Sequence, residues 1–419
     1  MDIIHVQGGS PLCGELKIQG SKNAVLPILA ATLLIEGCCY IKNCPRISDV
    51  ECMCGLLENM GCLVRWKKDG IEIDASQIKG NSLPRQRVIS MRSSIILLGP
   101  LLARCKEASL HYPGGCVIGE RPVDMHLHVL QGLGAEFAVE EEQIKGHARE
   151  LEGTIIYLPF PSVGATENGI LASVLAKGIT TLYNCAKEPE IQELCCFLNC
   201  AGAKIEGIGT DCLIIKGVKK LHPVSFTVCS DRIVAGTYLF SVAAATGKAF
   251  FYDAPLKDMG SAIAIAGMMG CRVHPYKEGI EVRQSESPKA VSGIKTAVYP
   301  GFPTDLQSVL MTALSVSRGE GVIEETIFSD RFHIAKELVR MGADIKTDGN
   351  YAFIKGRERL HGASVLAEDL RGGAALILAG ICAQGDTFVG NTHYIERGYE
   401  DICRDYCLLG AHVKKTGRI

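Results

Sequence analysis

Charged residues recur at one position of a repeat in this chain, and their types suit the binding of an anion. Counting back 37 to 42 residues from each of six regularly spaced glycines gives Lys22, Arg92, Gly164, Arg232, Asp305 and Arg371. Each lies where an apolar stretch with helical spacing begins, and an apolar helix should not open with a guanidinium unless an anion meets it there. The pattern therefore predicts a cleft lined with cations. The alternative is a set of local ion pairs, such as Arg371 with Asp369 or Arg232 with Asp231.

A loop over residues 113–124 holds a group that could act as a nucleophile or as an acid. Its sequence, PGGCVIGERPVD, places glycines and prolines around Cys116 and Arg121, which is typical of a surface loop that closes on a substrate. Arg121 would lower the pKa of the Cys116 thiol and hold an anion beside it. The alternative is a plain turn in which one of nineteen cysteines happens to fall.

Composition limits the partners of the protein. The chain has 419 residues, of which 47% are hydrophobic and 21% are charged, and its net charge is −2 at pH 7. This balance provides no basic field for nucleic acid or an anionic membrane, so any anion must meet a local cluster and the partner is expected to be small. The longest uncharged apolar run, residues 24–35, is too short to span a bilayer, and the first residues lack the pattern of a signal peptide. A cytoplasmic protein is predicted.

Nineteen cysteines raise the questions of disulfides and of metal binding. Their odd number and their spread along a long chain favour small buried hydrophobic residues in a reducing compartment. Two cysteine clusters could suggest a zinc site, namely Cys52 with Cys54, and Cys195 and Cys196 with Cys200. Neither has a second pair of ligands at zinc-finger spacing, so no metal is predicted. Cys196 and Cys200 are expected to face the core from one side of a helix. His126 and His128 fall on different faces of another expected helix and are interpreted as solvated or capping histidines.

The elements that must position these groups follow a repeat. A bulky residue, a glycine and then Ala or Cys recur six times, with the glycine at positions 61, 134, 202, 270, 342 and 410. A regular period over the whole chain predicts one supersecondary unit used six times. In the third unit the pattern predicts, in order, a helix, a strand, a helix stopped by Gly202 and two hairpin strands: 165–177, 178–184, 189–198, 203–207 and 212–217.

The sixth unit stops short of its last strand because the chain ends at Ile419. Residues 1–20, in which 4–7 and 14–18 alternate as strands, are predicted to supply it. The N-terminus then belongs to the last domain, which gives one domain of residues 1–20 and 230–419 and another of residues 21–229. Alternating helices and strands with mixed pairing predict an α/β fold with three units in each domain, in which the helices rich in small apolar residues are buried.

Seven segments carry a resemblance to a known family: SKNA at 21–24, the loop at 113–124, EPEI at 188–191, FPTD at 302–305, DRF at 330–332, DLR at 369–371 and ERGYE at 396–400. In order and spacing they resemble the UDP-N-acetylglucosamine 1-carboxyvinyltransferase family of the enolpyruvyl transferase superfamily. The resemblance covers the whole chain, and the cysteine loop is specific to this family. It implies two inside-out α/β barrel domains built from six repeated units, three in each domain, with buried helices, the sheets outside and an active site between the domains.

The resemblance implies transfer of the enolpyruvyl group of phosphoenolpyruvate to the 3′-hydroxyl of UDP-N-acetylglucosamine, with release of phosphate. This is the first committed step of peptidoglycan synthesis, and fosfomycin alkylates the loop cysteine in this family. No metal and no organic cofactor is implied. Cys116 matches the acid that protonates the methylene carbon of phosphoenolpyruvate. Asp305 matches the residue near the 3′-hydroxyl, where a carboxylate serves as base or as orienting group.

Further residues match family positions that bind the two substrates. Those expected around phosphoenolpyruvate are Lys22, Arg92, Arg121, Asp369, Arg371 and Arg397. Asn23 matches a side chain that binds both substrates. The nucleotide sugar is expected along Arg121, Pro122, Val123, Asp124, Met125, Ser162, Val163, Gly164 and Ile327. Within that set Asp124 is expected near the uracil, the backbone of 162–164 at the diphosphate and Ile327 against the sugar.

The sequence departs from the family near the diphosphate, where Phe160 and Pro161 stand in place of a lysine that is common before Ser162. Three other interpretations stay open. 5-Enolpyruvylshikimate-3-phosphate synthase shares the repeat and the anion cluster but lacks the Gly-Gly-Cys loop. A non-catalytic UDP-sugar-binding regulatory paralogue, or a structural repeat protein whose arginines only form salt bridges, would not need an intact set of reactive groups such as Lys22, Cys116, Asp305 and Arg397. The oligomeric state is not indicated.

Overall fold

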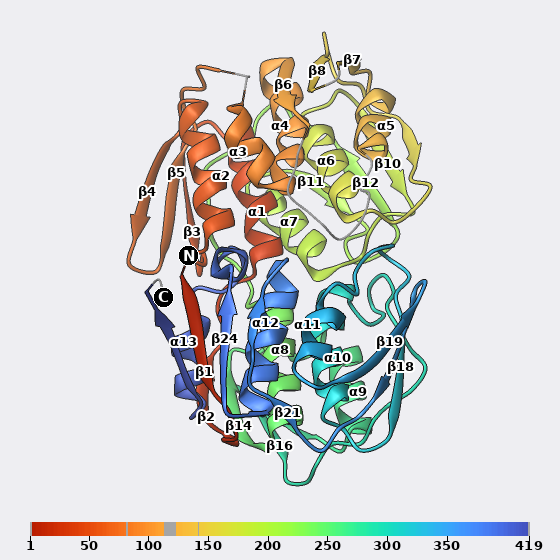
Figure 1. Ribbon diagram of the computed structural model, residues 1–419. Helices are drawn as coiled ribbons and strands as arrows, with labels where there is room; N and C mark the ends of the chain where they lie inside the picture. The colour runs from red at the N-terminus through yellow and green to blue at the C-terminus, as the bar shows by residue number, and fades with distance from the viewer. Residues whose placement is uncertain (1, 81–82, 113–122, 141, 418–419) are drawn as a thin grey trace. The chain divides into compact units, whose positions relative to one another are not determined.

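The structure of the protein is a computed structural model, which describes residues 2–80, 83–112, 123–140 and 142–417 (Figure 1). The described chain forms two compact units. The unit that contains helix α1 (Lys22–Ala31), here the α1 unit, holds residues 20–112 and 123–229. The unit that contains helix α8 (Arg232–Ala245), here the α8 unit, holds residues 2–19 and 230–417. The buried hydrophobic residues form one cluster in each unit, so each unit has a core of its own.

The sheets of the described chain repeat one strand order. In five of them an edge strand runs parallel to its neighbour, and two antiparallel pairings follow. Two of these five sheets lie in the α1 unit. One consists of β13 (Ser225–Thr227), β3 (Cys38–Lys42), β5 (Gly70–Asp74) and β4 (Leu63–Lys67). The other consists of β9 (Ile155–Tyr157), β10 (Ile179–Tyr183), β12 (Cys212–Lys216) and β11 (Lys204–Glu206). A third sheet there lacks the parallel strand and consists of β6 (Glu107–His111), β8 (Gln143–His147) and β7 (Glu136–Val139).

The α8 unit has three sheets with the complete order. The first consists of β2 (Leu12–Lys17), β14 (Gly247–Tyr252), β16 (Gly279–Gln284) and β15 (Arg272–Pro275). The second consists of β17 (Ile294–Lys295), β18 (Glu320–Glu324), β20 (Tyr351–Lys355) and β19 (Asp344–Asp348). The third is β22 (Ser364–Leu366), β24 (Asp386–Gly390), β1 (Ile3–Gln7) and β25 (His412–Thr416). A repeated unit is thus visible as a repeated sheet.

Strand β1 completes the last of these sheets, as the sequence predicts, whereas β2, the other strand expected within residues 1–20, pairs with β14 in a different sheet. It lies between β24 and β25 and is antiparallel to both, with His5 opposite Phe388 on one side and Lys414 on the other. The N-terminal strand therefore takes the place of the strand that the sixth unit lacks. Its sheet places the first and the last strand of the described chain side by side (Figure 1).

The central helices of each unit are buried on all sides. In the α1 unit they are α1, α4 (Leu98–Cys105), which continues the 3-10 helix η2 (Arg92–Leu97), and α6 (Val163–Ser173); in the α8 unit they are α8, α10 (Gln307–Ser315) and α12 (Leu370–Cys382). Helices α8, α10 and α12 pack against one another, and α6 packs against α4 and η2. Small residues along these helices let the backbones approach closely, and their aliphatic neighbours fill the space between them.

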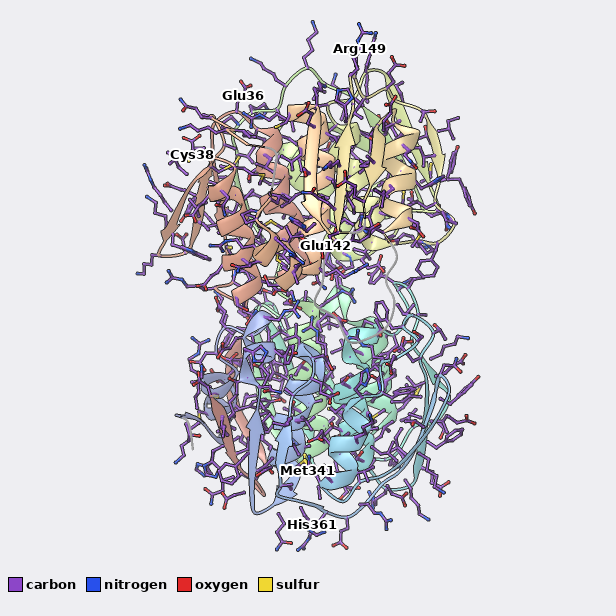
Figure 2. The ribbon with its side chains drawn as sticks, turned by 45° about the horizontal axis from the view of Figure 1, so that its top comes forward. Glu36, Cys38, Glu142, Arg149, Met341 and His361 are labelled. Carbon is purple, nitrogen blue, oxygen red and sulfur yellow. The ribbon has the colours of Figure 1, made fainter. Side chains whose placement is uncertain are left out.

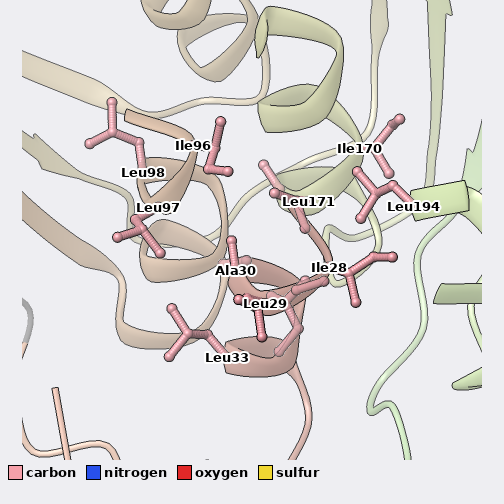
Figure 3. Close-up of a cluster of buried hydrophobic side chains, with 14 of the residues drawn as sticks. Ile28, Leu29, Ala30, Leu33, Ile96, Leu97, Leu98, Ile170, Leu171 and Leu194 are labelled. Atoms are coloured by element: carbon pink, nitrogen blue, oxygen red, sulfur yellow. The ribbon is translucent and has the colours of Figure 1, made fainter. Parts of the chain in front are cut away.

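Figure 3 shows how side chains of three central elements meet in the α1 unit. Ile28 and Leu29 come from α1, Leu97 from the end of η2, and Ile170 and Leu171 from α6, and all five are buried. Burying a side chain of this size contributes about 1.5 to 3 kcal/mol to the stability of a protein. This cluster holds the helices whose first residues carry the predicted site.

The six repeated glycines each end an outer helix. These helices are α2 (Ser48–Asn59), α5 (Asp124–Gly132), α7 (Pro189–Cys200), α9 (Gly260–Met268), α11 (Ile334–Arg340) and α13 (Ile402–Leu408). All six glycines have positive φ, between 84° and 99°. The residue after each glycine donates back into the helix, as Ala203 N does to Leu198 O at 3.0 Å, which is the Schellman cap. The small residue that follows each glycine in the sequence is therefore part of the cap.

The fold class is confirmed at the level of a mixed α/β protein. None of the sheets in the described ranges closes on itself, so the barrel in the prediction is not confirmed. Among the described residues, no helix has the length and apolar character needed to cross a membrane. The remaining short elements are η1 (Thr32–Leu34), α3 (Arg85–Ser90), η3 (Leu256–Asp258), η4 (Thr304–Leu306), η5 (Thr392–Arg397), β21 (Leu360–His361) and β23 (Ala383–Gln384).

The cysteine prediction is wrong in part. Of the eighteen cysteines in the described ranges, all are free thiols but only seven are buried, and Cys38, labelled in Figure 2, is one of five that are exposed. Of the three cysteines on α7, Cys195 is buried, whereas Cys196 and Cys200 share a face that is exposed to solvent. Helix α7 buries the stripe of Ile191, Leu194, Cys195 and Leu198, so helical spacing gave the shared face correctly and the core side wrongly.

Replacing Gly270 by Ala is expected to lower the free energy of unfolding by about 1 kcal/mol, because an L residue is strained at its φ of 98°. An added Cβ would meet only Gln284 Nε2, at 3.5 Å, so the cost comes from the backbone and not from a clash. Urea unfolding of purified wild type and variant measures this difference.

Gly267→Ala provides the matched control, because Gly267 lies inside α9 with no atom within 4 Å of an added Cβ. Alanine is favoured over glycine inside a helix by about 0.5 to 1 kcal/mol, so this variant should be more stable than wild type. If both alanines change stability in the same direction, the cap interpretation of the repeated glycine is wrong.

Candidate functional site

The predicted site residues fall in both units, and the structure describes all but three of them. Cys116, Arg121 and Pro122 lie outside the described residues. Lys22, Asn23, Arg92, Val123, Asp124, Met125, Ser162, Val163 and Gly164 belong to the α1 unit, and Asp305, Ile327, Asp369, Arg371 and Arg397 belong to the α8 unit.

Lys22 begins α1 and is held by a buried ion pair. Ser21 caps the helix by accepting from Ala24 N, and Asn23 follows Lys22 as a partly buried residue. The Lys22 Nζ lies 2.7 Å from Asp49 Oδ2, and the two side chains are only 10% and 5% exposed. Asp49 lies in the first turn of α2 and was missed from the sequence, because nothing in its local pattern shows which cation it meets. The pair fixes the ammonium at the start of α1.

The start of α6 lies against a buried histidine. Ser162 caps this helix by accepting from Ala165 N, and Val163 and Gly164 are its first residues. A Cβ added at Gly164 would come within 2.7 Å of His126 Cε1, so the imidazole occupies the space that a side chain there would need. The backbone N–H groups at this helix start and the imidazole edge therefore lie together.

Asn168 fixes which nitrogen of His126 carries a proton. The Asn168 Oδ1 accepts from Gly99 N at 2.8 Å, so the amide nitrogen is the group that donates to Ile95 O at 3.0 Å and to His126 Nδ1 at 2.8 Å. Nδ1 is therefore an acceptor, and a neutral His126 carries its proton on Nε2. Burial and then the charge of Arg92 lower the pKa of His126 to about 4. The interpretation of His126 as a solvated or capping histidine is wrong, whereas His128 is exposed.

Residues 123–125 join the described chain to α5. Val123 is buried, Asp124 begins α5 with an exposed carboxylate, and Met125 packs partly into the hydrophobic core. Phe160, which stands near the start of α6 where the family has a lysine, is 43% exposed. The structure thus puts an exposed apolar ring where the resemblance expects a cation.

Three carboxyl groups gather between α6 and α7. Glu167 is buried on α6, and Glu188 and Glu190 lie at the start of α7 and are also buried. Burial, followed by the charges of Glu190 and Glu188, raises the pKa of Glu167 well above its ordinary value. Sequence reasoning noted the motif at 188–191 and missed Glu167. Among the described residues, no group of three or more His, Cys, Asp or Glu side chains has an arrangement that could hold a metal ion.

Asp305 is the centre of the α8 unit's set. It lies on η4, ahead of α10, and its carboxylate is 28% exposed. Oδ1 accepts from Arg331 Nη2 at 2.8 Å and Oδ2 accepts from Arg371 Nη2 at 3.0 Å, so each carboxylate oxygen meets one guanidinium. Both arginine side chains are buried, at 3% and 5% exposed. Arg331 was not assigned a role from the sequence, although its motif carried part of the resemblance.

Arg371 pairs with Asp305 and not with its sequence neighbour. Asp369 Oδ1 instead caps α12 by accepting from Arg371 N at 2.9 Å and Gly372 N at 3.0 Å. In the same way Asp231 caps α8, and the guanidinium of Arg232 lies 5.6 Å from the ring centre of Tyr299. Burial is the largest single influence and lowers the pKa of Arg371, but Asp305, Tyr399 and Asp231 together outweigh it. The pKa is therefore raised, and this arginine stays charged.

Two donors of this set are buried without a partner. Arg371 Nη1 and Arg331 Nε have no hydrogen-bond partner among the described residues. Buried guanidinium donors are normally satisfied, and a carboxylate or phosphate oxygen is the acceptor that suits them. These donors suit an anionic oxygen, and Tyr399 is a further hydrogen-bonding neighbour of Arg371.

Ile327 and Arg397 lie on short irregular segments. Ile327 is partly buried, and its backbone N–H donates to the buried carboxylate of Glu325 at 2.8 Å. Arg397 is the last residue of η5 and is partly buried. Glu325 is a further residue that sequence reasoning missed.

Breaking the Lys22–Asp49 pair with Asp49→Ala is expected to lower the free energy of unfolding by about 3 kcal/mol or more, because a buried ammonium would lose its counter-charge. The matched control is Glu72→Ala, which removes a partner of Lys67 at 3.0 Å in the same unit, where the two side chains are 46% and 29% exposed. An exposed pair contributes about 1 kcal/mol or less. Urea unfolding measures both variants, and equal losses would show that burial of the Lys22 pair is unimportant.

His126 is expected to make the protein less stable as the pH falls from about 6.5 to about 4. In this window the unfolded histidine binds a proton and the folded one does not, so acid favours unfolding by up to about 3 kcal/mol. The measurement is the unfolding free energy against pH for wild type and His126→Gln, which should lack this part of the slope.

The matched control is His128→Gln, which alters an exposed imidazole of the same helix and should keep the wild-type slope. A slope that is the same in all three proteins would contradict the buried neutral state of His126.

Comparison with known proteins identifies relatives over the whole chain. Residues 6–405 match the family model described as EPSP synthase (3-phosphoshikimate 1-carboxyvinyltransferase). The chain is 46% identical over 413 residues to UDP-N-acetylglucosamine 1-carboxyvinyltransferase 2 of Caldanaerobacter subterraneus subsp. tengcongensis, with 99% of each covered. It is 44% identical over 418 residues to the UDP-N-acetylglucosamine 1-carboxyvinyltransferase of Desulfatibacillum aliphaticivorans, with 99% of this chain and 100% of that protein covered.

Solved structures show the same fold at lower identity. The enolpyruvyl transferase NikO from Streptomyces tendae superposes with a TM-score of 0.89 at 24% identity, and 99% of each chain is covered. EPSP synthase from Acinetobacter baumannii superposes with a TM-score of 0.78 at 18% identity over 100% of both chains. These two likenesses show that the chain has the fold of enolpyruvyl transferases.

Proposed function

The chain belongs to the UDP-N-acetylglucosamine 1-carboxyvinyltransferase family, and from this we propose that it transfers the enolpyruvyl group of phosphoenolpyruvate to the 3′-hydroxyl of UDP-N-acetylglucosamine. Phosphate is released, and the reaction is the first committed step of peptidoglycan synthesis. The observation that carries the proposal is the identity of 46% with a relative of that name over 99% of both chains.

The chemistry requires two proton movements and one new bond. The 3′-oxygen of the sugar attacks C2 of phosphoenolpyruvate and loses its proton, while C3 gains a proton. The carbon–oxygen bond to phosphate then breaks as C3 gives up a proton, which restores the double bond. Cys116 is proposed as the group that protonates C3, with Arg121 beside it. Both lie outside the described residues, so these roles rest on the resemblance.

The α1 unit supplies groups that suit the anionic parts of both substrates. Lys22 is a fixed ammonium at the start of α1, which suits the phosphate of phosphoenolpyruvate, and Asn23 and Arg92 are proposed to bind near it. The segment 162–164 is proposed to meet the diphosphate through the N–H groups of Val163 and Gly164, because a helix N-terminus favours anions, whereas Ser162 N already donates to Phe160 O at 2.7 Å. Residues 121–125 are proposed to contact the nucleotide, with Asp124 at the uracil.

The α8 unit supplies a carboxylate held by two cations. The ion pairs of Asp305 with Arg331 and Arg371 orient its side chain and stabilise the carboxylate form. This favours a role in orienting the 3′-hydroxyl over a role in taking its proton. The unpartnered donor of Arg371 suits an anionic oxygen of phosphoenolpyruvate.

The other proposed members of this set rest on the family alone. Arg397 is proposed to bind phosphoenolpyruvate, Asp369 to shape the same site and Ile327 to pack against the sugar. That residues of both units serve one substrate stays a prediction. The inside-out arrangement of three sheets around the central helices of each unit, with domains of residues 1–20 and 230–419 and of 21–229, is likewise proposed.

The rival activity, that of 5-enolpyruvylshikimate-3-phosphate synthase, is not favoured. The family model that matches the chain has that description, but the EPSP synthase structure shares only 18% of its residues with this chain. The 1-carboxyvinyltransferases that act on the UDP-sugar by name are 39% to 46% identical to it. The chain also has the Gly-Gly-Cys segment at 114–116.

The purified protein is expected to release phosphate from phosphoenolpyruvate only when UDP-N-acetylglucosamine is present, and Cys116→Ala should abolish this release. A phosphate assay with each substrate alone and with both measures it. The matched control is Cys38→Ala, which removes an exposed thiol and should retain activity. Equal release with shikimate 3-phosphate would establish the rival activity, and no release with either acceptor would favour a non-catalytic paralogue.

Mass spectrometry after treatment with fosfomycin gives a second measurement on the same protein. The epoxide should add to Cys116, because a thiolate beside an arginine is the most reactive thiol. An adduct on one of the other eighteen cysteines would make the assignment of Cys116 wrong.

A further inference from the structure

A buried carboxylate in the α8 unit joins two segments of the candidate site. Glu325 directly follows β18 and is 2% exposed. Its Oε1 accepts from Thr296 Oγ1 at 2.9 Å, from Ile327 N at 2.8 Å and from Phe328 N at 3.2 Å. Its Oε2 accepts from Thr304 Oγ1 at 2.8 Å. Four donors from three separate segments therefore meet on one side chain.

Two of the three segments carry residues of the candidate site: the one that contains Thr304 and the one that contains Ile327 and Phe328. Thr304 is the first residue of η4, and Asp305 is the next, so the bond from Thr304 fixes the start of the short helix that carries the carboxylate. The other segment holds Ile327 and Phe328, and the guanidinium of Arg331 lies 5.3 Å from the ring centre of Phe328. Glu325 thus constrains both sides of the Asp305–Arg331 ion pair.

We propose that Glu325 is a positioning residue, which holds Asp305 and the turn at Ile327 in fixed relation for the transfer reaction. It acts through the bond from Thr304 and through the backbone at 327–328. The catalytic part of this inference rests on the proposed function, whereas the link between the two segments does not.

The number of donors explains why a carboxylate is needed at this position. A buried charged group is costly unless hydrogen bonds satisfy it, and here four donors do so. An apolar side chain of similar size would leave those donors unsatisfied, two of them backbone N–H groups, and each costs about 1 to 3 kcal/mol when buried. Packing alone would not gather donors from three segments on one residue.

Three substitutions separate the connections of Glu325. Thr304→Val cuts only the bond toward Asp305. Glu325→Leu removes all four bonds, whereas Glu325→Gln keeps an amide oxygen for the three donors at Oε1 and turns an amide N–H to the Thr304 hydroxyl, which can accept. The matched control is Thr326→Val, which removes the 2.6 Å bond from Thr326 Oγ1 to Thr296 O in the same network without a link to Asp305.

The activity readout is kcat and KM for UDP-N-acetylglucosamine. Thr304→Val should lower kcat by about tenfold or more with little change in KM, since misplacement of a reacting group reduces the rate of the chemical step. Glu325→Leu should lower kcat and also raise KM, because the turn at Ile327 is released. Glu325→Gln and Thr326→Val should stay near wild type. Equal kcat for Thr304→Val and Thr326→Val would overturn the proposal.

Amide hydrogen exchange gives a readout that does not need turnover. Glu325→Leu should speed exchange in peptides covering 302–308 and 326–330, and Thr304→Val only in the first of these. Unchanged exchange in both peptides of Glu325→Leu would overturn the proposal even if the enzyme is active. If wild type has no transferase activity while exchange responds as described, the proposed function fails and the structural link stands.

Discussion

The central helices have no side that faces water, and this constraint decides where charge can be held in each unit. Helix α8 is buried from Ile233 to Ala244, and α12 is buried from Leu370 to Ile381. A charged side chain in the middle of such a helix would be desolvated without compensation, whereas the first turn offers N–H groups and the positive end of the helix dipole. Charge is therefore held at the helix starts, after cap residues that already satisfy the backbone: Ser21, Ser162, Asp231 and Asp369.

Burial at the helix starts requires that each charged side chain find a partner on another element. Lys22 meets Asp49 from α2, and Arg371 meets Asp305 from η4, which also binds Arg331. A buried pair of this kind adds little net stability, but it is costly to break and it holds both groups in one geometry. Charged groups that are already fixed in place need no reorganisation when an anion binds. In enzymes, such groups stabilise the charge that develops in a transition state. The same constraint thus explains both the packing of these helices and the position of their charged groups.

Features with a period could be predicted from the sequence, whereas pairings between elements could not. The six glycines predicted one unit used six times, and Gly202 predicted a helix end, which recurs at all six glycines because each has the positive φ of a cap. The strand missing from the last unit was predicted within residues 1–20, where β1 supplies it. Asp49 and Glu325 were missed because their partners lie on other elements, which only the folded chain brings close. The spacing of Cys196 and Cys200 gave a shared face, but the stronger stripe of Leu194 and Leu198 decides which face is buried.

Gly164 is the one uncharged residue among the six equivalent positions at the helix starts. A side chain there would collide with the His126 ring, which the amide of Asn168 holds in place. Burial lowers the pKa of that imidazole to about 4, so it brings no charge to the start of α6 at neutral pH. Where α1 and α12 present cations with fixed partners, α6 presents backbone N–H groups beside a neutral ring. The repeat supplies equivalent helix starts, and the choice between a charged side chain and glycine decides whether a start presents a fixed charge or only backbone N–H groups.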